Sequence, residues 1–415
     1  MQKFSRAALL RALVPGLVLS LSMTGCKDPN ASKSADASGN GSTTTASTAA
    51  VQDTTGDTIN VGQYASLTGE TSTFGVESNA GLTFAVDEIN AAGGIEVGGK
   101  KMLVKVETQD DQSKADEAKT IAVKYAGDAK IVAVIGEVAS SRSKTAAPEF
   151  QRAGIPMISP SSTNPDVTKV GDHIFRVCFI DPFQGYVMAK FATEELKLKK
   201  VAILRDPSQD YSVGLADVFK EEFTKMGGEI VADASYNAKD SDFRSQLGQI
   251  KTAAADGIFI PGYYNEVGTI ARQAKELGIT VPLMGGDGWD SEKLVEGAGG
   301  PGKALEGAYF STHYSKDSKD QKVQDFVKAF TTKTGKAPAS LVAQGYDAMM
   351  ILADAIKRAG SIERKKVRDA LAQTKDYVAV TGKITIDENR NANKSAVVLQ
   401  ISGAEFKYVK TVDPK

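Results

Sequence analysis

The sequence contains very few residues of the kinds that bind metals or form covalent cross-links. Its 415 residues include two cysteines, two histidines and one tryptophan. These numbers are too small for a structural zinc site or for a disulfide scaffold. The sequence therefore predicts a fold stabilised by its own core, with no metal and no cofactor.

An excess of charge of one sign is also missing. The chain has 50 basic and 51 acidic residues, which gives a net charge of -1. This balance excludes a chain-wide attraction to nucleic acid, so no nucleic-acid partner is expected. With 41% hydrophobic and 24% charged residues the composition is that of a globular protein, and the length predicts at least two domains. We expect the protein to be a monomer.

A hydrophobic run long enough to span a bilayer is absent from the N-terminal region, which instead has the layout of an export signal. Basic residues between positions 3 and 11 precede an apolar run of about ten residues, which is half of what a spanning helix needs. The small pair Thr24-Gly25 before Cys26 is similar to the lipobox of bacterial lipoproteins, in which that cysteine is acylated. The alternative is an ordinary signal peptide that contains a cysteine.

The segment after Cys26 has almost no residue that could enter a core. Positions 27–56 are nearly all Ser, Thr, Ala, Gly, Asp, Asn and Lys, a composition typical of a flexible linker. Such a linker of this length reaches roughly 30 Å. The sequence thus predicts a signal peptide over 1–25 and a lipidated N-terminus with a tether over 26–56, which would hold the protein at a membrane.

From Thr58 onward, short β-branched runs alternate with amphipathic stretches. Such alternation predicts α/β structure with parallel sheets covered by helices, and its restart after Asp181 predicts two lobes. The predicted strands are 59–64, 102–107, 131–135, 155–159, 201–204, 230–234, 258–260, 283–284, 383–386 and 397–401. The predicted helices are 75–92, 113–126, 140–153, 211–226, 266–277, 321–333, 341–359 and 363–373.

Polar residues follow several predicted strands, at the sheet edge where open α/β folds bind ligands. Two segments, Gly136–Ser141 and Pro160–Pro165, place hydroxyl and amide groups at a helix start or turn, where they could hold a carboxylate. In the second half, Pro261–Tyr264 and Asp287–Trp289 offer aromatic rings and an acid. Together these groups are complementary to a zwitterion such as a free amino acid, although each could instead serve only to cap a helix or form a turn.

Four segments of the chain carry a family resemblance. They are positions 64–69 (Tyr-Ala-Ser-Leu-Thr-Gly), 87–95 (Asp-Glu-Ile-Asn-Ala-Ala-Gly-Gly-Ile), 158–165 (Ile-Ser-Pro-Ser-Ser-Thr-Asn-Pro) and 284–288 (Met-Gly-Gly-Asp-Gly). In this order they are similar to segments of the leucine/isoleucine/valine-binding proteins of ABC importers. The resemblance extends from about Thr58 to the C-terminus.

The resemblance implies a type I periplasmic binding protein, with two Rossmann-like lobes that close on a ligand and are joined by three crossings. We expect the crossings near Phe179, His313 and Gly382, so that 57–178 with 314–381 form lobe 1 and 179–313 with 382–415 form lobe 2. The implied function is to bind a free amino acid, branched-chain or otherwise apolar or small, and to deliver it to the membrane subunits of an ABC permease. The protein would then be a lipid-anchored lipoprotein of the periplasm or cell envelope, and not an enzyme.

The resemblance also implies roles for individual residues. Ser140 and Thr163 would bind the ligand carboxylate, while the Ser161 carbonyl would accept from the ammonium group. Asp287 would pair with the ammonium from the other lobe. Glu137, beside the carboxylate site, departs from the family pattern and would disfavour an acidic ligand or favour a basic or hydroxylated one. Two tyrosines would cover the ligand and a phenylalanine would line its side-chain pocket. The full expected set is Phe74, Ser140, Ser141, Ser161, Ser162, Thr163, Tyr211, Tyr263 and Asp287.

Other functions have weaker support. Three patterns, S-x-x-K from Ser141, Y-x-N from Tyr263 and K-T-G from Lys333, occur in the order used by serine acyl-transfer enzymes of the penicillin-recognising class. In that class the K-T-G pattern lies on a strand, whereas here Gly335 is expected to end a helix. A sensing receptor subunit of the same fold, for an amide or an amino acid, is a further alternative.

Four residues outside these patterns have predicted places. His173 and His313 are expected to be exposed or to cap helices, because no metal-ligand spacing surrounds them. Trp289 could wall the cleft or pack in the core. Cys178 is expected to be a small buried residue.

Overall fold

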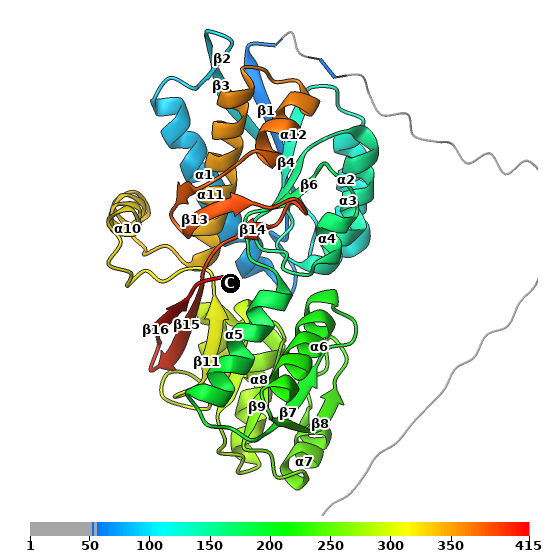
Figure 1. Ribbon diagram of the computed structural model, residues 1–415, viewed down its shortest axis with the longest axis vertical. Coiled ribbons are helices and arrows are strands. Elements are labelled where there is room, and N and C mark those ends of the chain that lie inside the picture. The colour runs from blue at the N-terminus through cyan, green and yellow to red at the C-terminus, as the bar shows by residue number, and fades with distance from the viewer. Residues whose placement is uncertain (1–51, 54–55, 415) are drawn as a thin grey trace, which may run out of the picture. The chain divides into compact units, whose positions relative to one another are not determined.

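The computed structural model describes residues 52–53 and 56–414 (Figure 1). The predicted signal peptide, the predicted lipidation site Cys26 and most of the predicted tether lie outside the described residues. Within the described part of the chain, no helix combines the length and the apolar character needed to cross a membrane.

The first lobe is built on a six-stranded sheet with the order β2-β3-β1-β4-β5-β6. All neighbouring strands are parallel except the β2–β3 pair, and the central strand β4 consists entirely of buried apolar residues. The strands are β1 (Thr58–Ala65), β2 (Ile95–Val97), β3 (Lys100–Asp110), β4 (Ile131–Ile135), β5 (Met157–Ser159) and β6 (Ile174–Arg176).

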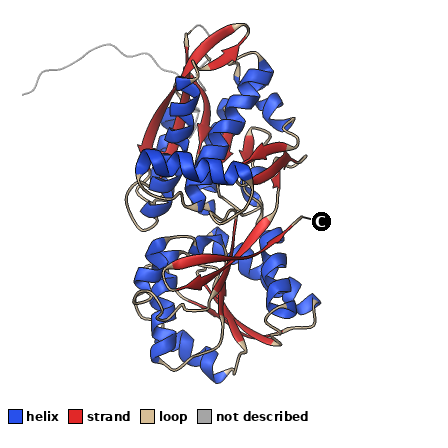
Figure 2. Cartoon of the chain, turned by 90° about the vertical axis from the view of Figure 1, so that its left-hand side faces the viewer, coloured by secondary structure: helices blue, strands red, loops and turns tan. Residues whose placement is uncertain are grey.

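Helices cover both faces of this sheet, as Figure 2 shows. Alternate residues of β1 and β4 point to opposite faces, where they join two different buried clusters. One cluster contains α1 and α11, which approach so closely that a Cβ at Gly81 would lie 1.8 Å from the carbonyl oxygen of Val342. The helices are α1 (Ser72–Ala91), α2 (Ala115–Ala126), α3 (Ser140–Ala153), α4 (Asp166–Lys169), α10 (Gln321–Thr334), α11 (Ser340–Ala359) and α12 (Arg364–Ala372).

The second lobe is built on a seven-stranded sheet with the order β16-β15-β11-β10-β9-β7-β8. The strands from β7 to β11 are parallel, and the β15–β16 hairpin adds an antiparallel edge. Its strands are β7 (Lys200–Arg205), β8 (Glu229–Ser235), β9 (Gly257–Phe259), β10 (Leu283–Gly285), β11 (Tyr309–Thr312), β15 (Ala396–Ser402) and β16 (Glu405–Val412). Its helices are α5 (Asp181–Glu194), α6 (Asp210–Lys225), α7 (Arg244–Thr252), α8 (Tyr264–Glu276), α9 (Glu292–Gly297) and the 3-10 turn η1 (Asp287–Trp289).

The predicted fold class is therefore confirmed, and α3 has the predicted bounds. Several elements were not predicted, among them α5, β6, β11 and β16. Helix α5 buries residues around most of its circumference, so its sequence lacks the one-sided apolar pattern of a surface helix. In β16 the alternation is weak because Tyr408 and Val409 are both exposed.

The chain passes between the lobes three times. It crosses between β6 and α5 and again after β11, where Tyr314 already packs in a cluster with α1 and α10. The third crossing follows a small sheet of β12 (Tyr377–Ala379), β13 (Gly382–Ile386) and β14 (Ala392–Asn393). Ile384, Ile386 and Ala392 pack in the core of the first lobe, so we place this crossing after β14. The expected position near Gly382 is earlier, because the alternation of β13 does not indicate which core it faces.

Candidate functional site

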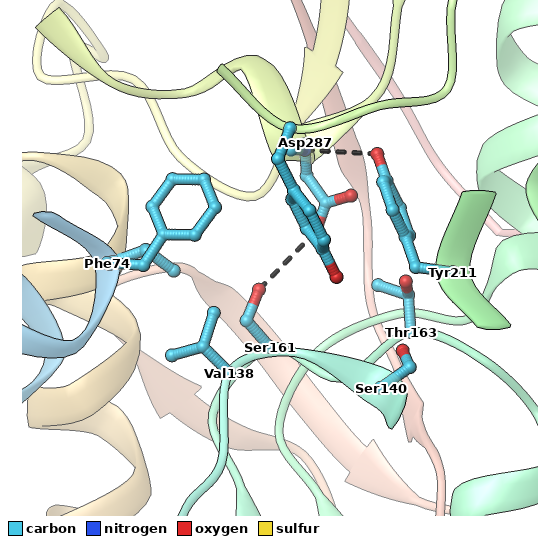
Figure 3. Close-up of a pocket in the computed structure, with 10 residues that line it drawn as sticks. Phe74, Val138, Ser140, Ser161, Thr163, Tyr211 and Asp287 are labelled. Carbon is cyan, nitrogen blue, oxygen red and sulfur yellow. Dashed lines mark hydrogen bonds between the residues drawn. The ribbon is translucent and has the colours of Figure 1, made fainter. Parts of the chain in front are cut away.

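A small cavity with a free volume of about 10 Å³ lies at the carboxyl ends of strands from both sheets (Figure 3). All of the expected site residues line it except Ser141 and Ser162. Val138, Gly288 and Leu341 also line it and were not predicted. The complete lining is Phe74, Val138, Ser140, Ser161, Thr163, Tyr211, Tyr263, Asp287, Gly288 and Leu341.

The first-lobe wall offers hydroxyl groups and a helix N-terminus. Ser140 is the first residue of α3, whose opening N–H groups have no acceptor within the helix. The Ser140 hydroxyl accepts from the Asn164 amide at 3.2 Å, which ties the α3 start to the loop that follows β5. Ser161 and Thr163 belong to the same loop and line the cavity. This wall is electropositive without containing a cationic side chain.

Ser141 and Ser162 support the walls from behind. The Ser162 hydroxyl lies 2.7 Å from that of Ser143 and 2.9 Å from the Glu137 carbonyl oxygen, so it joins the two loops of the first lobe. The Ser141 hydroxyl accepts from the Asp210 amide at 2.9 Å, at the start of α6 in the second lobe.

Glu137 does not line the cavity, contrary to the expectation that it would influence the ligand. It is buried, and its Oε2 accepts from Arg142 Nε at 2.8 Å and from the Ala139 amide at 2.6 Å. Asp111 completes the cluster, 4.0 Å from Arg142 Nε. Burial and the nearby Glu137 charge raise the pKa of Asp111 to about 7. The charges of this buried cluster are therefore balanced inside the wall.

The second-lobe wall presents Asp287 at the start of η1. The Asp287 amide donates to Gln184 Oε1 at 2.8 Å, and its carboxylate Oδ2 lies 3.0 Å from His313 Nε2 and 3.4 Å from the Ser161 hydroxyl. The other oxygen, Oδ1, is buried and has no hydrogen-bond partner among the described residues. The cavity thus contains a carboxylate oxygen that is ready to accept a hydrogen bond.

His313, which contacts Asp287 from behind the cavity, is a further residue whose role the sequence did not reveal. Its side chain is 1% exposed and its ring stacks on Phe179 at a centroid distance of 3.7 Å. Burial lowers the pKa of His313 to about 4, and the contact with Asp287 only partly opposes this. The imidazole is therefore neutral at neutral pH, so Nε2 donates to the Asp287 carboxylate without cancelling its charge. In the sequence, the predicted position of His313 at a crossing between the lobes was the one signal of its contact with Asp287. The expectation that His313 is exposed or caps a helix was wrong.

Aromatic rings close the remaining side of the cavity. Tyr211 and Tyr263 stack at 5.2 Å, and the Tyr211 hydroxyl accepts from the Gly288 amide at 3.0 Å (Figure 3). Phe74 approaches Tyr263 and Tyr264 edge-on, at 6.0 and 4.9 Å. Because Phe74 lies on α1 and the tyrosines lie in the second lobe, these rings bring the two lobes together.

Polar contacts also join the lobes around the cavity. Lys144 Nζ lies 2.7 Å from Asp210 Oδ1, and the Asn164 side-chain amide donates to the Asp210 carbonyl oxygen at 2.8 Å. On the opposite side, the Tyr264 hydroxyl donates to the Glu70 carbonyl oxygen at 2.9 Å. The structure therefore has the closed arrangement, in which the cavity walls of both lobes meet.

Tyr263 of the competing Y-x-N pattern lines the cavity, but the other two patterns do not supply catalytic groups to it. The Lys144 amine binds Asp210, and Gly335 ends α10 in the left-handed conformation at φ 76°, as predicted. Trp289 is buried in the core, where its Nε1 donates to the Ile260 carbonyl oxygen at 2.9 Å. Burial raises the pKa of Cys178 to about 12, so it is an inert thiol. Among the described residues, no group of three or more His, Cys, Asp or Glu side chains could hold a metal ion.

Known proteins show the same architecture. The leucine-binding protein LivK of Thermotoga maritima is 38% identical with a TM-score of 0.81, and the match covers 86% of this chain and 99% of that one. LivJ of Streptococcus pneumoniae, solved with isoleucine, is 34% identical with a TM-score of 0.80, over 86% and 100% of the two chains. The leucine-, isoleucine-, valine-, threonine- and alanine-binding protein of Pseudomonas aeruginosa is 29% identical over 333 residues, which cover 80% of this chain and 86% of that protein.

A family model described as periplasmic binding protein matches residues 58–405, which is nearly all of the described chain. The resemblance predicted from the sequence is therefore confirmed. The chain belongs to the periplasmic binding protein family, with branched-chain amino acid-binding proteins among its relatives.

Proposed function

We propose that this protein is the extracytoplasmic solute-binding component of an ABC importer and that it binds a free amino acid in the cavity between its lobes. The observation that carries this proposal is the charged Asp287 carboxylate, with its unpartnered Oδ1, opposite a wall of hydroxyl groups and helix amides. In this proposal the protein performs no chemistry on the ligand.

The first lobe would hold the ligand carboxylate. The α3 N-terminus and the hydroxyls of Ser140 and Thr163 lie on the same wall, and a helix N-terminus with nearby hydroxyl donors is a common way to bind an anion. The buried Glu137 is neutralised by Arg142, so it does not repel an anion at this wall.

The second lobe would hold the ligand ammonium. A neutral His313 leaves the Asp287 charge uncompensated, and burial raises the pKa of nearby Asp181 to about 8, so that this second carboxyl is mostly protonated at neutral pH. Asp287 then supplies the negative charge of the cavity. The Ser161 carbonyl is proposed to accept a further hydrogen bond from the ammonium.

An aliphatic ligand side chain fits the apolar part of the lining. Phe74, Val138 and Leu341 contribute this surface from the first lobe. The closed cavity has only about 10 Å³ of free volume, so the lobes must move apart to admit a ligand of this size. Relatives that bind leucine and isoleucine support a branched-chain ligand, or another small apolar one.

Recognition by two lobes would couple binding to closure. A ligand whose carboxylate and ammonium are held by different lobes stabilises only the closed arrangement, so a population of open molecules shifts toward it. The closed form would then be the one that the permease membrane subunits recognise.

We further propose that the N-terminal region exports the protein to the periplasm and anchors it to a membrane through a lipid on Cys26. The support is the signal-like sequence that ends in Thr24-Gly25-Cys26 and the tether-like composition after it. Changing Cys26 to Ser should release the protein from the detergent phase into the aqueous phase. Retention of the variant in detergent would contradict lipidation at this residue.

The proposed ligand class can be tested by thermal unfolding in the presence of matched compounds. Leucine at about 100 times its Kd should add roughly 2.7 kcal/mol to the free energy of unfolding. Two leucine analogues serve as controls, 4-methylpentanoate without the ammonium and 3-methylbutylamine without the carboxylate, and neither should stabilise the protein appreciably. Stabilisation by either analogue alone, or by none of the amino acids, would contradict the proposal.

A further inference from the structure

A fully buried arginine lies behind the loop that forms part of the first-lobe wall. Arg176 is the last residue of β6, the edge strand of the first sheet, and it is in register with Ser159 at the end of β5. The loop 160–165 follows β5 and lines the cavity through Ser161 and Thr163. Arg176 itself is 0% exposed and does not line the cavity.

The Arg176 guanidinium holds backbone carbonyl groups of this loop. Its Nη1 donates to the Ser162 carbonyl oxygen, and its Nη2 donates to the Asn164 carbonyl oxygen at 2.8 Å. The Cys178 thiol also donates to the Ser162 oxygen, at 3.4 Å. Because neither Arg176 nor Cys178 lines the cavity, these contacts turn the loop carbonyls away from it.

The direction of the Ser162 carbonyl fixes the direction of the next amide. In a planar trans peptide the C=O and the following N–H point in opposite directions, so the Thr163 N–H points away from Arg176. The amides on either side of Thr163 already have acceptors, the hydroxyls of Ser159 and Ser140 at 2.8 and 3.2 Å. The Thr163 amide has no acceptor within the described part of the chain, and Thr163 lines the cavity. This N–H is therefore available to a ligand.

The positive charge of Arg176 has no carboxylate paired with it. Its hydrogen-bond acceptors among the described residues are uncharged oxygens of the loop and of Thr168. Asp181 and Asp387 favour its charged form, but neither accepts a hydrogen bond from it, and burial raises the pKa of Asp181 to about 8. A buried charge without a counter-charge is unfavourable, so a ligand carboxylate on the other side of the loop would be attracted.

We propose that Arg176 is a positioning residue for the ligand carboxylate. By holding the Ser162 carbonyl it directs the Thr163 amide into the cavity, and its charge favours an anion there. This role rests on the amino-acid function proposed above. The alternative is that Arg176 only satisfies loop carbonyls and stabilises the fold. A fold-only role would affect all ligands of the cavity equally, whereas a positioning role would affect ligands that carry a carboxylate.

The test compares leucine with leucinamide, which keeps the ammonium and the side chain but lacks the negative charge. Titration calorimetry gives the ratio of the two affinities for each variant. Arg176→Gln removes the charge, so it should lower the leucine affinity about ten- to hundredfold and the leucinamide affinity much less. Arg176→Lys keeps the charge but loses the planar fork that holds two carbonyls, so it should change the ratio less than Arg176→Gln does.

Arg364→Gln is the matched control. Arg364 is also buried in the first lobe and also donates to backbone carbonyls, those of Ile131 at 2.9 Å and Asp128 at 2.8 Å. These lie at or before the start of β4, at the end of the sheet opposite the cavity. Arg364→Gln should lower the stability of the protein but leave the ratio of affinities unchanged.

Two results would overturn the role of Arg176 while leaving the amino-acid function intact. They are an unchanged ratio in Arg176→Gln and an equal change of the ratio in Arg364→Gln, each with leucine bound by the wild type. A wild type that does not bind leucine or any other amino acid would instead contradict the amino-acid function, and the role of Arg176 with it.

A measurement on the wild type decides the matter if Arg176→Gln does not fold. In NMR spectra the Thr163 amide proton should move downfield when leucine binds, and less with leucinamide, because a carboxylate is the stronger acceptor. The Ser162 and Asn164 amides, which already have acceptors, should move little with either ligand. Equal shifts of all three amides, or no shift of the Thr163 amide with leucine, would overturn the proposal.

Discussion

The two walls of the amino-acid cavity support their polar groups in opposite ways. In the first lobe the ionised side chains, Glu137 and Arg142, pair with each other inside the wall, and the polar groups that reach the cavity are hydroxyl and amide groups. In the second lobe the carboxylate of Asp287 itself reaches the cavity, and its supporting partner, His313, is kept neutral by burial. The first wall keeps its ionised side chains away from the cavity, whereas the second wall places one carboxylate in it.

This difference predicts where each wall is sensitive to substitution. A buried ion pair leaves a destabilising unpaired charge when one partner is removed, so changes behind the first wall should act on folding. The Asp287 carboxylate has one oxygen that faces no protein partner, so changes in the second wall should act mainly on binding. The four predictions below test this contrast.

The largest effect is expected when the buried pair of the first wall is broken. Arg142→Met leaves Glu137 and Asp111 without their cation and should lower the free energy of unfolding by about 3–5 kcal/mol. Denaturant unfolding would measure this loss. The double variant Arg142→Met with Glu137→Gln should recover much of it, because the unpaired charge is gone, and a double variant as unstable as the single one would contradict the ion-pair explanation.

The second wall should respond in the opposite sense. Asp287→Ala should weaken binding of the amino acid by at least about 30-fold, because the ligand ammonium loses its charged partner, while the free energy of unfolding changes little. Titration calorimetry and thermal unfolding separate the two quantities. Asp217→Asn is a matched control, since Asp217 is an exposed acid in the same lobe that pairs with Arg205. Retained affinity in Asp287→Ala would remove the basis for the proposed ammonium site.

The neutral state of His313 predicts a pH dependence. Its pKa is about 4 in the folded protein and about 6.5 in the unfolded chain, so protons favour the unfolded chain between these values. The stabilising contribution of a neutral His313 is therefore complete above pH 6.5 and is lost as the pH falls toward 4, by up to roughly 3 kcal/mol. Asp181 contributes with the opposite sign, since its raised pKa favours the folded state at low pH.

A variant isolates the His313 contribution from that of Asp181. The stability difference between the wild type and His313→Gln, measured by denaturant unfolding from pH 7.5 to pH 4.5, should shift against the wild type as the pH falls. His313→Gln retains a side-chain donor for Asp287, so its affinity at neutral pH should remain closer to that of the wild type than the affinity of His313→Phe. A difference that does not vary with pH would show that His313 is already charged in the folded protein.

The contrast between the walls also explains what could be predicted from the sequence. The first wall follows two strands whose loops are rich in Ser and Thr, and the second contains an acid after a Gly-Gly pair, so both walls were visible as local composition. His313 was not, because its role depends on a contact with Asp287, 26 residues away, and on a stack with Phe179. The roles of Glu137 and Ser162 were missed for the same reason, since only the folded chain shows which way a side chain points.

The smallest effect should come from a contact between the walls that does not touch the ligand. The Ser141 hydroxyl accepts from the Asp210 amide only when the lobes are closed, so Ser141→Ala should weaken amino-acid binding about two- to tenfold by raising the dissociation rate. Thr145→Ala is the control, because the Thr145 hydroxyl lies one turn further along α3 and bonds within that helix to the Ser141 carbonyl oxygen. If the amino acid dissociates equally fast from both variants, the effect belongs to α3 itself. If only Ser141→Ala releases the amino acid faster, hydrogen bonds across the cleft stabilise the closed form. Each wall then contributes to binding by holding the other wall in place.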